Sequence, residues 1–563
     1  MSLPNTEPSI ENTSNEENTY SGTATFLYSS KITGNVNLEG MCEILAESDA
    51  FSFALTSSGR MFFKENGRLR SKQIDIETTI TEQAITVTGH NEFLNANPGD
   101  SNIFALSTAL NLTLSDKHLF NAAYGFPTES ARIFMRPIAI QCEGDDGHEF
   151  IVPYIRVYVG GILSISLPTV IEFEDSTIPE IVHNEVNKSR RNIVSVLCEK
   201  ELHLACTESQ ISQMTRRDRL AQRKSFESII DLALGTPEKI EFADECLTVY
   251  ELVHTDQFTL TDIARNLLSV VARTIALGAV QTRINWYSSQ YKDDSVGQHW
   301  RGKPIIYIRS HSQQKCSSSD NWAKHKQLVD SVLARNYLPE TSSHPDLNPK
   351  DLRGPDDYNN FYTEPVSLML AGTQVQDLIE NHSTYTFNNL TSDIQVLNEA
   401  SHYILTYYSY SSLGLDNCTT AMDVAKLELK ILDFEETLLS AHKYGEIAKY
   451  IEEIQKGDHL TTIYKLLHKK TETVRKALEL DDKIKSESYT RRITLIFGVI
   501  ASATLSPELM QPLAKYFEVA PENDDLAKVY GIGSSVIVVA GLLTLIHYTF
   551  KLKDWIVKTL YRR

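Results

Sequence analysis

A glycine-rich segment at 297–303 has residue types that could bind a phosphate group. It reads Gly-Gln-His-Trp-Arg-Gly-Lys and matches the GxxxxGK start of a phosphate-binding loop. In such loops a Ser or Thr follows the lysine to reach Mg²⁺, and the loop leads into the N-terminus of a helix. Here Pro304 follows Lys303, and the next residues, IIYIRS, have the composition of a strand. We therefore expect no nucleotide site in this segment.

Three histidines and a cysteine in the same region could ligate a metal ion. His299, His311, Cys316 and His325 are separated by 12, 5 and 9 positions, which matches no standard zinc pattern. The chain also lacks HExxH, GxSxG, GxGxxG and EF-hand motifs. We expect no catalytic residue and no bound cofactor, and an enzymatic function is the less favoured class.

The composition limits the class of protein. The chain has 563 residues, of which 42% are hydrophobic and 23% charged, and its formal net charge is −19. Such an acidic chain is not expected to bind nucleic acid, which needs a basic surface. Seven cysteines in this length are too few for a disulfide-based scaffold. We expect several domains around more than one core.

Two apolar runs stand near the C-terminus. Residues 529–550 contain no Asp, Glu, Lys or Arg, and a helix of that length is about 33 Å long, enough to cross a hydrocarbon core. A shorter run, Ile493–Ser506, precedes it. These runs predict a membrane hairpin, with helices at 493–513 and 529–550 and an outer loop at 514–528. Taken alone, each run also fits a buried core helix.

Basic residues flank the hairpin on both sides. Lys and Arg cluster before the first run and in the tail at 551–563, whereas the connection between the runs is acidic. Because basic flanks stay in the cytoplasm, both termini are expected there. The chain is therefore expected in the cell (inner) membrane, in contact with lipid. The residues expected at the membrane interface are Arg491, Arg492, Lys551, Lys553 and Trp555.

The rest of the chain predicts an α+β cytoplasmic domain, β-rich first and helical second. Residues 150–173 are predicted to form a buried β-hairpin, because Gly160-Gly161 is a turn signal and two prolines interrupt any helix. Helical spacing is found at 184–197 and 259–280. The expected parts are an acidic disordered tail (1–22), a β-rich part (23–175), a helical part (176–285), an irregular insertion with a mixed α/β segment (286–418) and a helical stalk (419–492).

The stalk is predicted from a heptad pattern. Its apolar positions are Val424, Leu427, Ile431, Phe434 and Leu438. The segment 455–459 interrupts the pattern, which resumes at Leu460 and continues to Leu478. The second helix could run directly into the first apolar run and act as a mechanical connector. The alternative is a helical hairpin packed within the soluble domain, and the two can coexist.

The first apolar run could line a pore. Thr494, Gly498, Ser502 and Leu505 recur every three or four residues, so they share one helix face. In an oligomer, Glu508 would add a ring of carboxylates favouring cations. The alternative is that the hydroxyls bond backbone carbonyls and that Glu508 lies at the membrane interface.

The order of these parts resembles the CorA-like metal-ion transporters. The similarity covers about 420–563: a long helix, two membrane helices, an acidic short loop and a basic tail. The hairpin at Tyr154–Leu167 is similar to the strand pair that precedes the helices of that family. The resemblance implies a homo-oligomer, five chains in that family, and a divalent cation such as Mg²⁺ as the transported or regulatory ion. Where the family has Gly-Met-Asn, this chain has Leu505-Ser-Pro-Glu-Leu509.

Two functions follow as expectations. The first is an oligomeric cation channel or transporter, gated by a large cytoplasmic domain through the stalk. The alternative is a membrane-anchored sensor or effector, for example in antiviral defence, whose cytoplasmic domain recognises an unknown ligand and whose hairpin anchors it in the membrane or permeabilises the membrane.

Overall fold

The computed structural model gives an α+β protein. It describes residues 18–32, 36–79, 84–120, 128–212, 235–252, 257–279, 302–312, 323–339, 349–352, 358–372, 375–377, 386–441 and 445–516, with isolated positions between 525 and 548. The chain divides into two compact units. Unit 1 comprises Met1–Asp416 and Leu427–His468, and unit 2 comprises Asn417–Lys426 and Lys469–Arg563.

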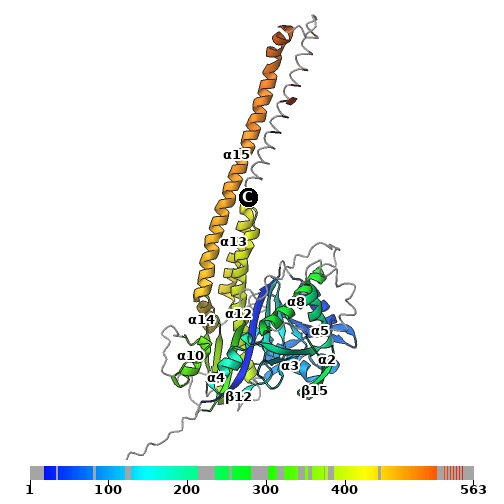
Figure 1. Ribbon diagram of the computed structural model, residues 1–563, viewed down its shortest axis with the longest axis vertical. Coiled ribbons are helices and arrows are strands. Elements are labelled where there is room, and N and C mark those ends of the chain that lie inside the picture. The colour runs from blue at the N-terminus through cyan, green and yellow to red at the C-terminus, as the bar shows by residue number, and fades with distance from the viewer. Residues whose placement is uncertain are drawn as a thin grey trace, which may run out of the picture. The chain divides into compact units, whose positions relative to one another are not determined.

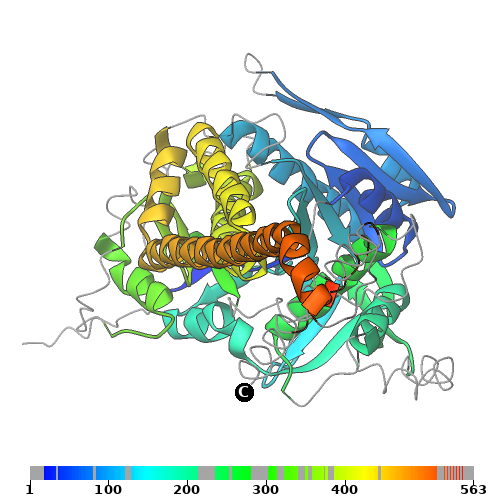
Figure 2. The same ribbon diagram turned by 90° about the horizontal axis from the view of Figure 1, so that it is seen from above.

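Unit 1 is built on an eleven-stranded sheet. Its strands are β1 (Tyr20–Lys31), β2 (Phe51–Thr56), β3 (Arg60–Glu65), β4 (Arg68–Gln73), β7 (Ser130–Met135), β10 (Tyr154–Tyr158), β11 (Ile162–Pro168), β12 (Phe173–Ser176), β16 (Lys303–His311), β17 (Tyr358–Tyr362) and β18 (Ser367–Ala371). Their order is β17-β18-β16-β1-β11-β10-β7-β2-β3-β4, with β12 paired to β1. Only β16 and β18 run parallel among these pairs. Strands β2–β4 lie toward one side of the unit and α10 toward the other in both ribbon views (Figures 1 and 2).

Two smaller sheets accompany it. A five-stranded sheet has the order β14-β15-β13-β8-β9. Its strands are β14 (Glu238–Phe242), β15 (Glu245–Glu251), β13 (Ile193–Glu199), β8 (Ile138–Cys142) and β9 (Glu149–Ile151). Strands β5 (Asp75–Thr79) and β6 (Ala84–Thr88) form a separate antiparallel pair.

Helices cover the sheets and form the C-terminal part. They are α1 (Leu38–Glu47), α2 (Asn91–Ala96), α3 (Asp100–Leu119), α4 (Ile178–Glu180), α5 (Lys200–Ser212), α8 (Leu260–Ala279), α10 (Lys326–Ala334), α12 (Phe387–Gly414), α13 (Ala421–Ser440), α14 (Gly445–Lys456) and α15 (Asp458–Tyr516). Short turns of π- or 3₁₀-helix are η1 (Ile181–Val186), η2 (Lys188–Arg190) and η4 (Leu415–Asn417).

One face of the large sheet is apolar. Side chains alternate between the faces along a strand, and Tyr28, Ile165, Ile155 and Ile133 lie in register across β1, β11, β10 and β7. They belong to the main hydrophobic core together with buried residues of α1, α8 and α10. Burial of this face supplies the main apolar stabilisation of unit 1.

The opposite face is also buried, but it is polar. Arg132, Arg156, Ser164 and Ser29 lie in register across β7, β10, β11 and β1. Helix α12 contacts this face at β1, β11 and β16, and it also packs against α3. A buried sheet face with arginines is unusual, because charged groups are rarely buried unless paired.

Strand β1 approaches β16 closely at Gly22, which predicts a sensitive position. A Cβ at Gly22 would collide with the backbone carbonyl of Tyr307. Gly22→Ala is therefore expected to push the two strands apart and to lower the free energy of unfolding by about 2 kcal/mol, measured by denaturant titration. Gly147→Ala is the matched control, because nothing lies within 4 Å of a Cβ at that position. Equal stability of the two variants would contradict this reading.

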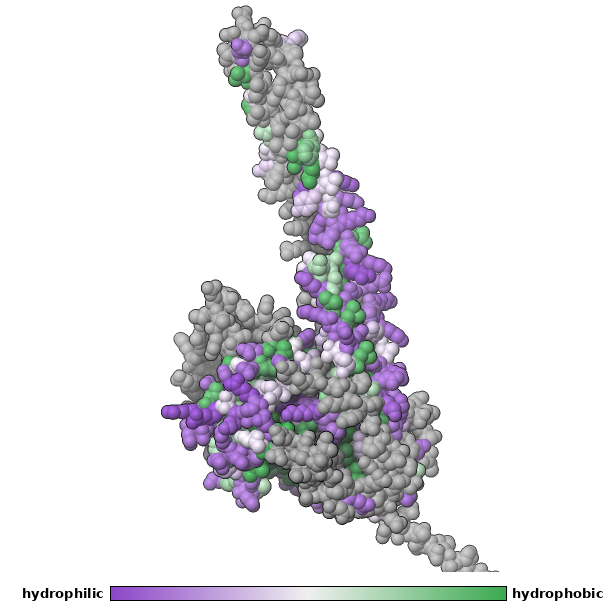
Figure 3. Space-filling model, turned by 180° about the vertical axis from the view of Figure 1, so that it is seen from behind, coloured by the Kyte–Doolittle hydropathy of each residue, from purple (hydrophilic) through white to green (hydrophobic). Residues whose placement is uncertain are grey.

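The expected membrane hairpin at 493–513 and 529–550 is wrong. Within the described residues, no helix combines the length and the apolar character needed to cross a membrane. The segment 493–513 lies inside α15, which starts at Asp458. The part of α15 that precedes residue 493 is largely hydrophilic on its surface (Figure 3) and carries intrahelical ion pairs such as Lys485–Asp481. The first apolar run has only 14 residues and directly follows this charged part. Most residues of the second run, 529–550, lie outside the described residues.

Other secondary-structure predictions had mixed outcomes. The hairpin expected within 150–173 is confirmed as the antiparallel pair β10–β11, and the helix expected at 259–280 is confirmed as α8. The helix expected over 184–197 is wrong, because only short π and 3₁₀ turns precede strand β13, which begins at Ile193. A short apolar run rich in β-branched residues fits either structure until its partners are known.

Candidate functional site

Helix α12 provides the polar side chains that meet the polar sheet face. Its start is fixed by Thr386 and Asn389, whose side chains cap the first turn reciprocally. In the middle of the helix, Asn398, Glu399 and His402 are all fully buried. A helix with buried polar side chains needs partners on the opposing surface, because an unpaired polar group loses its hydration without compensation.

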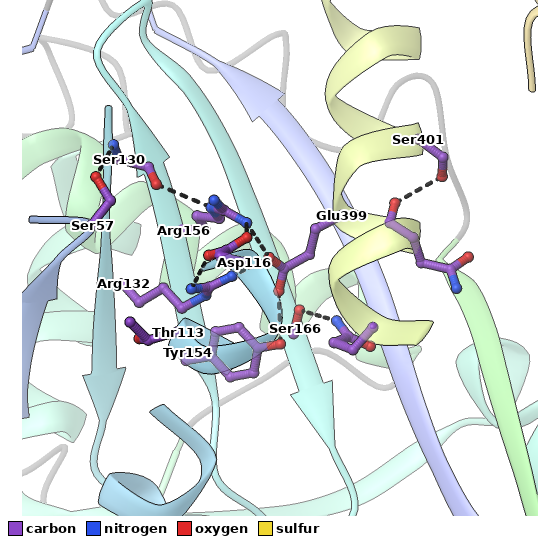
Figure 4. Close-up of polar contacts among 12 residues, drawn as sticks. Ser57, Thr113, Asp116, Ser130, Arg132, Tyr154, Arg156, Ser166, Glu399 and Ser401 are labelled. Carbon is purple, nitrogen blue, oxygen red and sulfur yellow. Dashed lines mark hydrogen bonds and ion pairs between the residues drawn. The ribbon is translucent and has the colours of Figure 1, made fainter. Parts of the chain in front are cut away.

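Glu399 joins a buried network of four charges (Figure 4). Its carboxylate accepts hydrogen bonds at 3.0 Å from Arg132 and at 3.0 Å from Arg156. Asp116 of α3 accepts from the same two guanidinium groups, at 2.6 Å and 3.0 Å. The four side chains are between 0% and 7% exposed. Two arginines and two carboxylates balance each other, so the network is electrically neutral.

Neighbouring hydroxyls complete the network. Tyr154 donates to Glu399 at 2.8 Å, and Arg156 donates to Ser130 at 3.1 Å. Burial acts to raise the pKa of Glu399, but Arg132 and Arg156 hold it below its usual value of 4.5. The charges are mutually satisfied. We therefore assign this network a structural role: it fastens α12 and α3 to the sheet.

A second polar cluster lies toward the β16–β17 end of the same face. Its centre is Lys303, the first residue of β16, which is 1% exposed. Its Nζ lies 3.6 Å from the centre of the Tyr362 ring, which gives a cation–π attraction. Among the described residues, this ammonium has no hydrogen-bond partner. The cluster therefore contains a buried cation without a paired anion.

Other polar atoms of this cluster are also unsatisfied. Asn360 Oδ1, Asn398 Oδ1 and Glu364 Oε1 are buried and find no hydrogen-bond partner among the described residues. Buried polar groups in folded proteins are nearly always bonded, so several exceptions in one place require an explanation. The contrast with the charge network under the same helix is one of charge: the arginines there are paired with carboxylates, whereas Lys303 has no hydrogen-bonded carboxylate among the described residues.

Glu364 connects the cluster to the start of α15. It lies in the turn between β17 and β18, and its charge favours the protonated form of Lys303. A Cβ placed on Gly457, between α14 and α15, would lie 3.2 Å from Glu364 Oε1. On α14, Tyr450 packs edge-to-face on Tyr362, with ring centres 5.1 Å apart. Lys303 is thus surrounded by residues that position the α14–α15 junction.

Burial controls the protonation of the cluster. It lowers the pKa of Lys303 well below its usual value of 10.5, against the opposing effect of Glu364. It also lowers the pKa of His402, and the charge of Lys303 lowers it further. An approach of Lys303 to Glu364 would pair the two groups and favour the protonated form of the lysine more strongly. The cluster can therefore adopt a second, better paired arrangement only if the surrounding elements shift.

The histidines considered as metal ligands are partly brought together. The rings of His311 and His325 lie 4.3 Å apart, and His325 Nδ1 is 2.9 Å from the hydroxyl of Tyr20. Desolvation by burial lowers the pKa of His325 to about 4, with His311 adding to the effect. His299 and Cys316 lie outside the described residues. In the described part of the chain, no three His, Cys, Asp or Glu side chains are grouped to hold a metal ion.

The expected pore residues lie on α15. Thr494 and Gly498 are exposed, and the Thr494 hydroxyl donates to the carbonyl of Thr490 at 2.8 Å. Ser502, Leu505 and Glu508 follow on the same helix, and their side chains lie outside the description.

The expected interface residues are placed only in part. Arg491 is exposed, and the Arg492 guanidinium lies 6.0 Å from the centre of the Tyr489 ring. Lys551, Lys553 and Trp555 lie outside the described residues. The pore and interface assignments stay predictions.

Sequence reasoning missed the polar layer. It considered Lys303 only as the lysine of a GxxxxGK match, rejected a phosphate loop there and predicted a strand, which β16 confirms. The partner helix α12 begins more than eighty positions later, at Phe387. The sequence offered only a weak signal, because Asn398, Glu399 and His402 stand among many other polar residues of α12.

Comparison of the chain with protein-family models, curated proteins and solved structures finds no match. The CorA-like resemblance therefore stays a prediction.

Proposed function

We propose that this chain is a regulatory protein that acts as a sensor. Its α+β unit changes how α12 and α14 pack against the sheet, and this change is passed to α15. The proposal rests on Lys303, which is buried beneath α12 and α14 and has no hydrogen-bond partner among the described residues. A regulatory element needs two states that differ by only a few kcal/mol. Incomplete pairing of the polar layer lowers the stability of the state in which α12 and α14 pack on the sheet. It therefore brings that state closer in free energy to one in which they are displaced.

The elements involved follow one another in the chain. Helix α12 is followed by α13, α14 and α15, and Gly457 alone separates α14 from α15. Glu364 lies against that glycine, and Tyr450 packs on the ring that also contacts Lys303. We infer that formation of a Lys303–Glu364 pair would displace α14 and the first turn of α15. A ligand that favours either arrangement would shift the population between them.

The cation channel expected from the sequence is not tested by the described residues and stays a prediction. No nucleic acid is expected as a partner, since the chain is acidic.

Hydrogen exchange on the full-length protein tests the proposed function. We expect the amides of α12 and α14 to exchange together, through an opening of lower free energy than that of β1 and β11. Lys303→Met is expected to slow this exchange about tenfold or more, because it removes the buried amine that disfavours the packing of α12 and α14 on the sheet. Helix α8 is the internal control, since it packs on the apolar face. If wild-type α12 exchanges only together with β1, α12 is a fixed part of the fold and the proposal is wrong.

A further inference from the structure

Helix α13 carries an exposed apolar stripe that the rest of the described chain does not cover. Met422, Leu429, Leu432 and Leu439 are 64%, 59%, 58% and 73% exposed. Large apolar side chains lined up on one surface helix are unusual, whereas single exposed ones are common. The stripe is therefore a candidate contact surface.

The spacing of the stripe is that of a coiled coil. Its members are separated by 7, 3 and 7 positions, which are a and d positions of a heptad. Ala425 occupies another d position, and Glu436 is the charged exception at an a position. The expected heptad residues Val424, Ile431, Phe434 and Leu438 form a different, buried stripe of α13.

The buried stripe already has its partners within the chain. The Phe434 ring lies 3.9 Å from the Tyr407 ring of α12, centre to centre. At about 100° per residue, the exposed stripe is on roughly the opposite side of the helix. The exposed stripe is thus left available for another helix with the same repeat.

We propose that two copies of this chain pair through α13 in antiparallel orientation. An antiparallel pair brings a positions opposite d positions, so that Leu429 faces the partner's Leu432 and Met422 faces the partner's Leu439. The symmetry repeats each contact, so one stripe serves both copies. Every large apolar residue of the stripe is then covered by another.

The charged residues beside the stripe favour one relative orientation of the two α13 helices. In the antiparallel pair the e positions face each other, which brings Lys426 beside the partner's Asp433 twice. In a parallel pair, Glu428 would instead face the partner's Asp433, and like charges at these positions disfavour pairing. On the other edge of the stripe the g positions face each other, which brings Glu428 beside the partner's Glu435 as a like-charge contact; within the chain, Tyr408 donates to Glu435 at 3.1 Å. The antiparallel pair thus has both opposite-charge and like-charge contacts, whereas the parallel pair has like-charge contacts only and also brings Glu436 opposite the partner's Glu436.

Sedimentation velocity of the full-length protein at increasing concentration tests the pairing. We expect a monomer–dimer equilibrium that Leu429→Lys weakens about tenfold or more. Leu466→Lys is the matched control, because Leu466 on α15 is as exposed as Leu432, at 58%, and lies outside the stripe. A monomer at every concentration, or a dimer unaffected by Leu429→Lys, would overturn the proposal.

Charge reversal tests the orientation. Lys426→Asp is expected to weaken the dimer, and adding Asp433→Lys is expected to restore it, since the pair is re-formed with opposite polarity. Both positions are exposed, so neither change should unfold the chain, and circular dichroism checks this. Failure of the second change to restore the dimer would rule out the antiparallel arrangement.

Discussion

Replacing Arg156 by methionine is expected to lower the free energy of unfolding by about 3–5 kcal/mol, the usual cost of removing one partner from a buried ion network. The change leaves Asp116 and Glu399 with Arg132 as their only cation in the network. Two carboxylates would then share one guanidinium in a site without solvent. Denaturant titration measures the loss, and the slope of the titration shows whether the folded state stays compact.

A surface ion pair provides the control for Arg156. Arg309 pairs with Glu172 at 2.8 Å, and the two side chains are 42% and 31% exposed. Arg309→Met is expected to cost at most about 1 kcal/mol, because solvent screens such pairs. A double variant with Glu399→Met is expected to lose less than the sum of the single variants, since the excess carboxylate is removed as well. Strict additivity would show that the four charges do not act as one network.

The network also predicts that the free energy of unfolding falls at acidic pH. The pKa of Glu399 is held below 4.5 in the folded state by its arginines, against burial. The unfolded chain therefore binds more protons as the pH falls below 4.5, and the stability contributed by Glu399 is lost there. In Arg156→Met this part of the acid dependence should shrink, because one of the two arginines that hold the pKa down is gone.

Local patterns predicted several elements of the fold. The turn at Gly160-Gly161 and its β-branched flanks are sufficient to identify β10 and β11. The 3.6-residue spacing of α8 and the heptad positions of α13 likewise act within one helix. These signals are local in the chain, so they can be interpreted without knowing the tertiary contacts.

The candidate site could not be predicted in this way. Glu399 meets Arg156 across 243 positions of sequence, and Asp116 lies on yet another element. Nothing in a single sequence pairs such residues. The strand at Lys303 was predicted, but the environment of its side chain was not, because that environment depends on Tyr362 and on the helices that bury it.

The membrane hairpin failed for a different reason. Its prediction rested on the apolar content of the two runs and on the flanking charges, although the first run, Ile493–Ser506, is shorter than a helix that crosses a bilayer. In the structure, residues 493–513 belong to a helix that starts at Asp458 and carries charged side chains along much of its length.

Lys303→Met is expected to raise the free energy of unfolding by about 3 kcal/mol at neutral pH, because it replaces a buried, unpaired cation with an apolar side chain of similar length. The folded-state pKa of Lys303 is lowered well below 10.5 by burial. The unfolded chain therefore binds the extra proton, and wild-type stability should rise with pH toward 10.5. In Lys303→Met this rise should be absent, so the two proteins should become more alike in alkaline solution.

Lys188 provides a control of opposite sign. It is as deeply buried as Lys303, but it donates to Glu149 and Glu185 at 2.8 Å and 2.9 Å. Burial opposes its charge, yet the two carboxylates hold its pKa above 10.5. Lys188→Met should therefore destabilise the protein at neutral pH, since it leaves two carboxylates without their cation. Thermal and denaturant unfolding of both variants between pH 7 and pH 10 decide the matter. If both lysines destabilise on removal, Lys303 is a paired structural lysine, and the two-state balance proposed for α12 and α14 loses its physical basis.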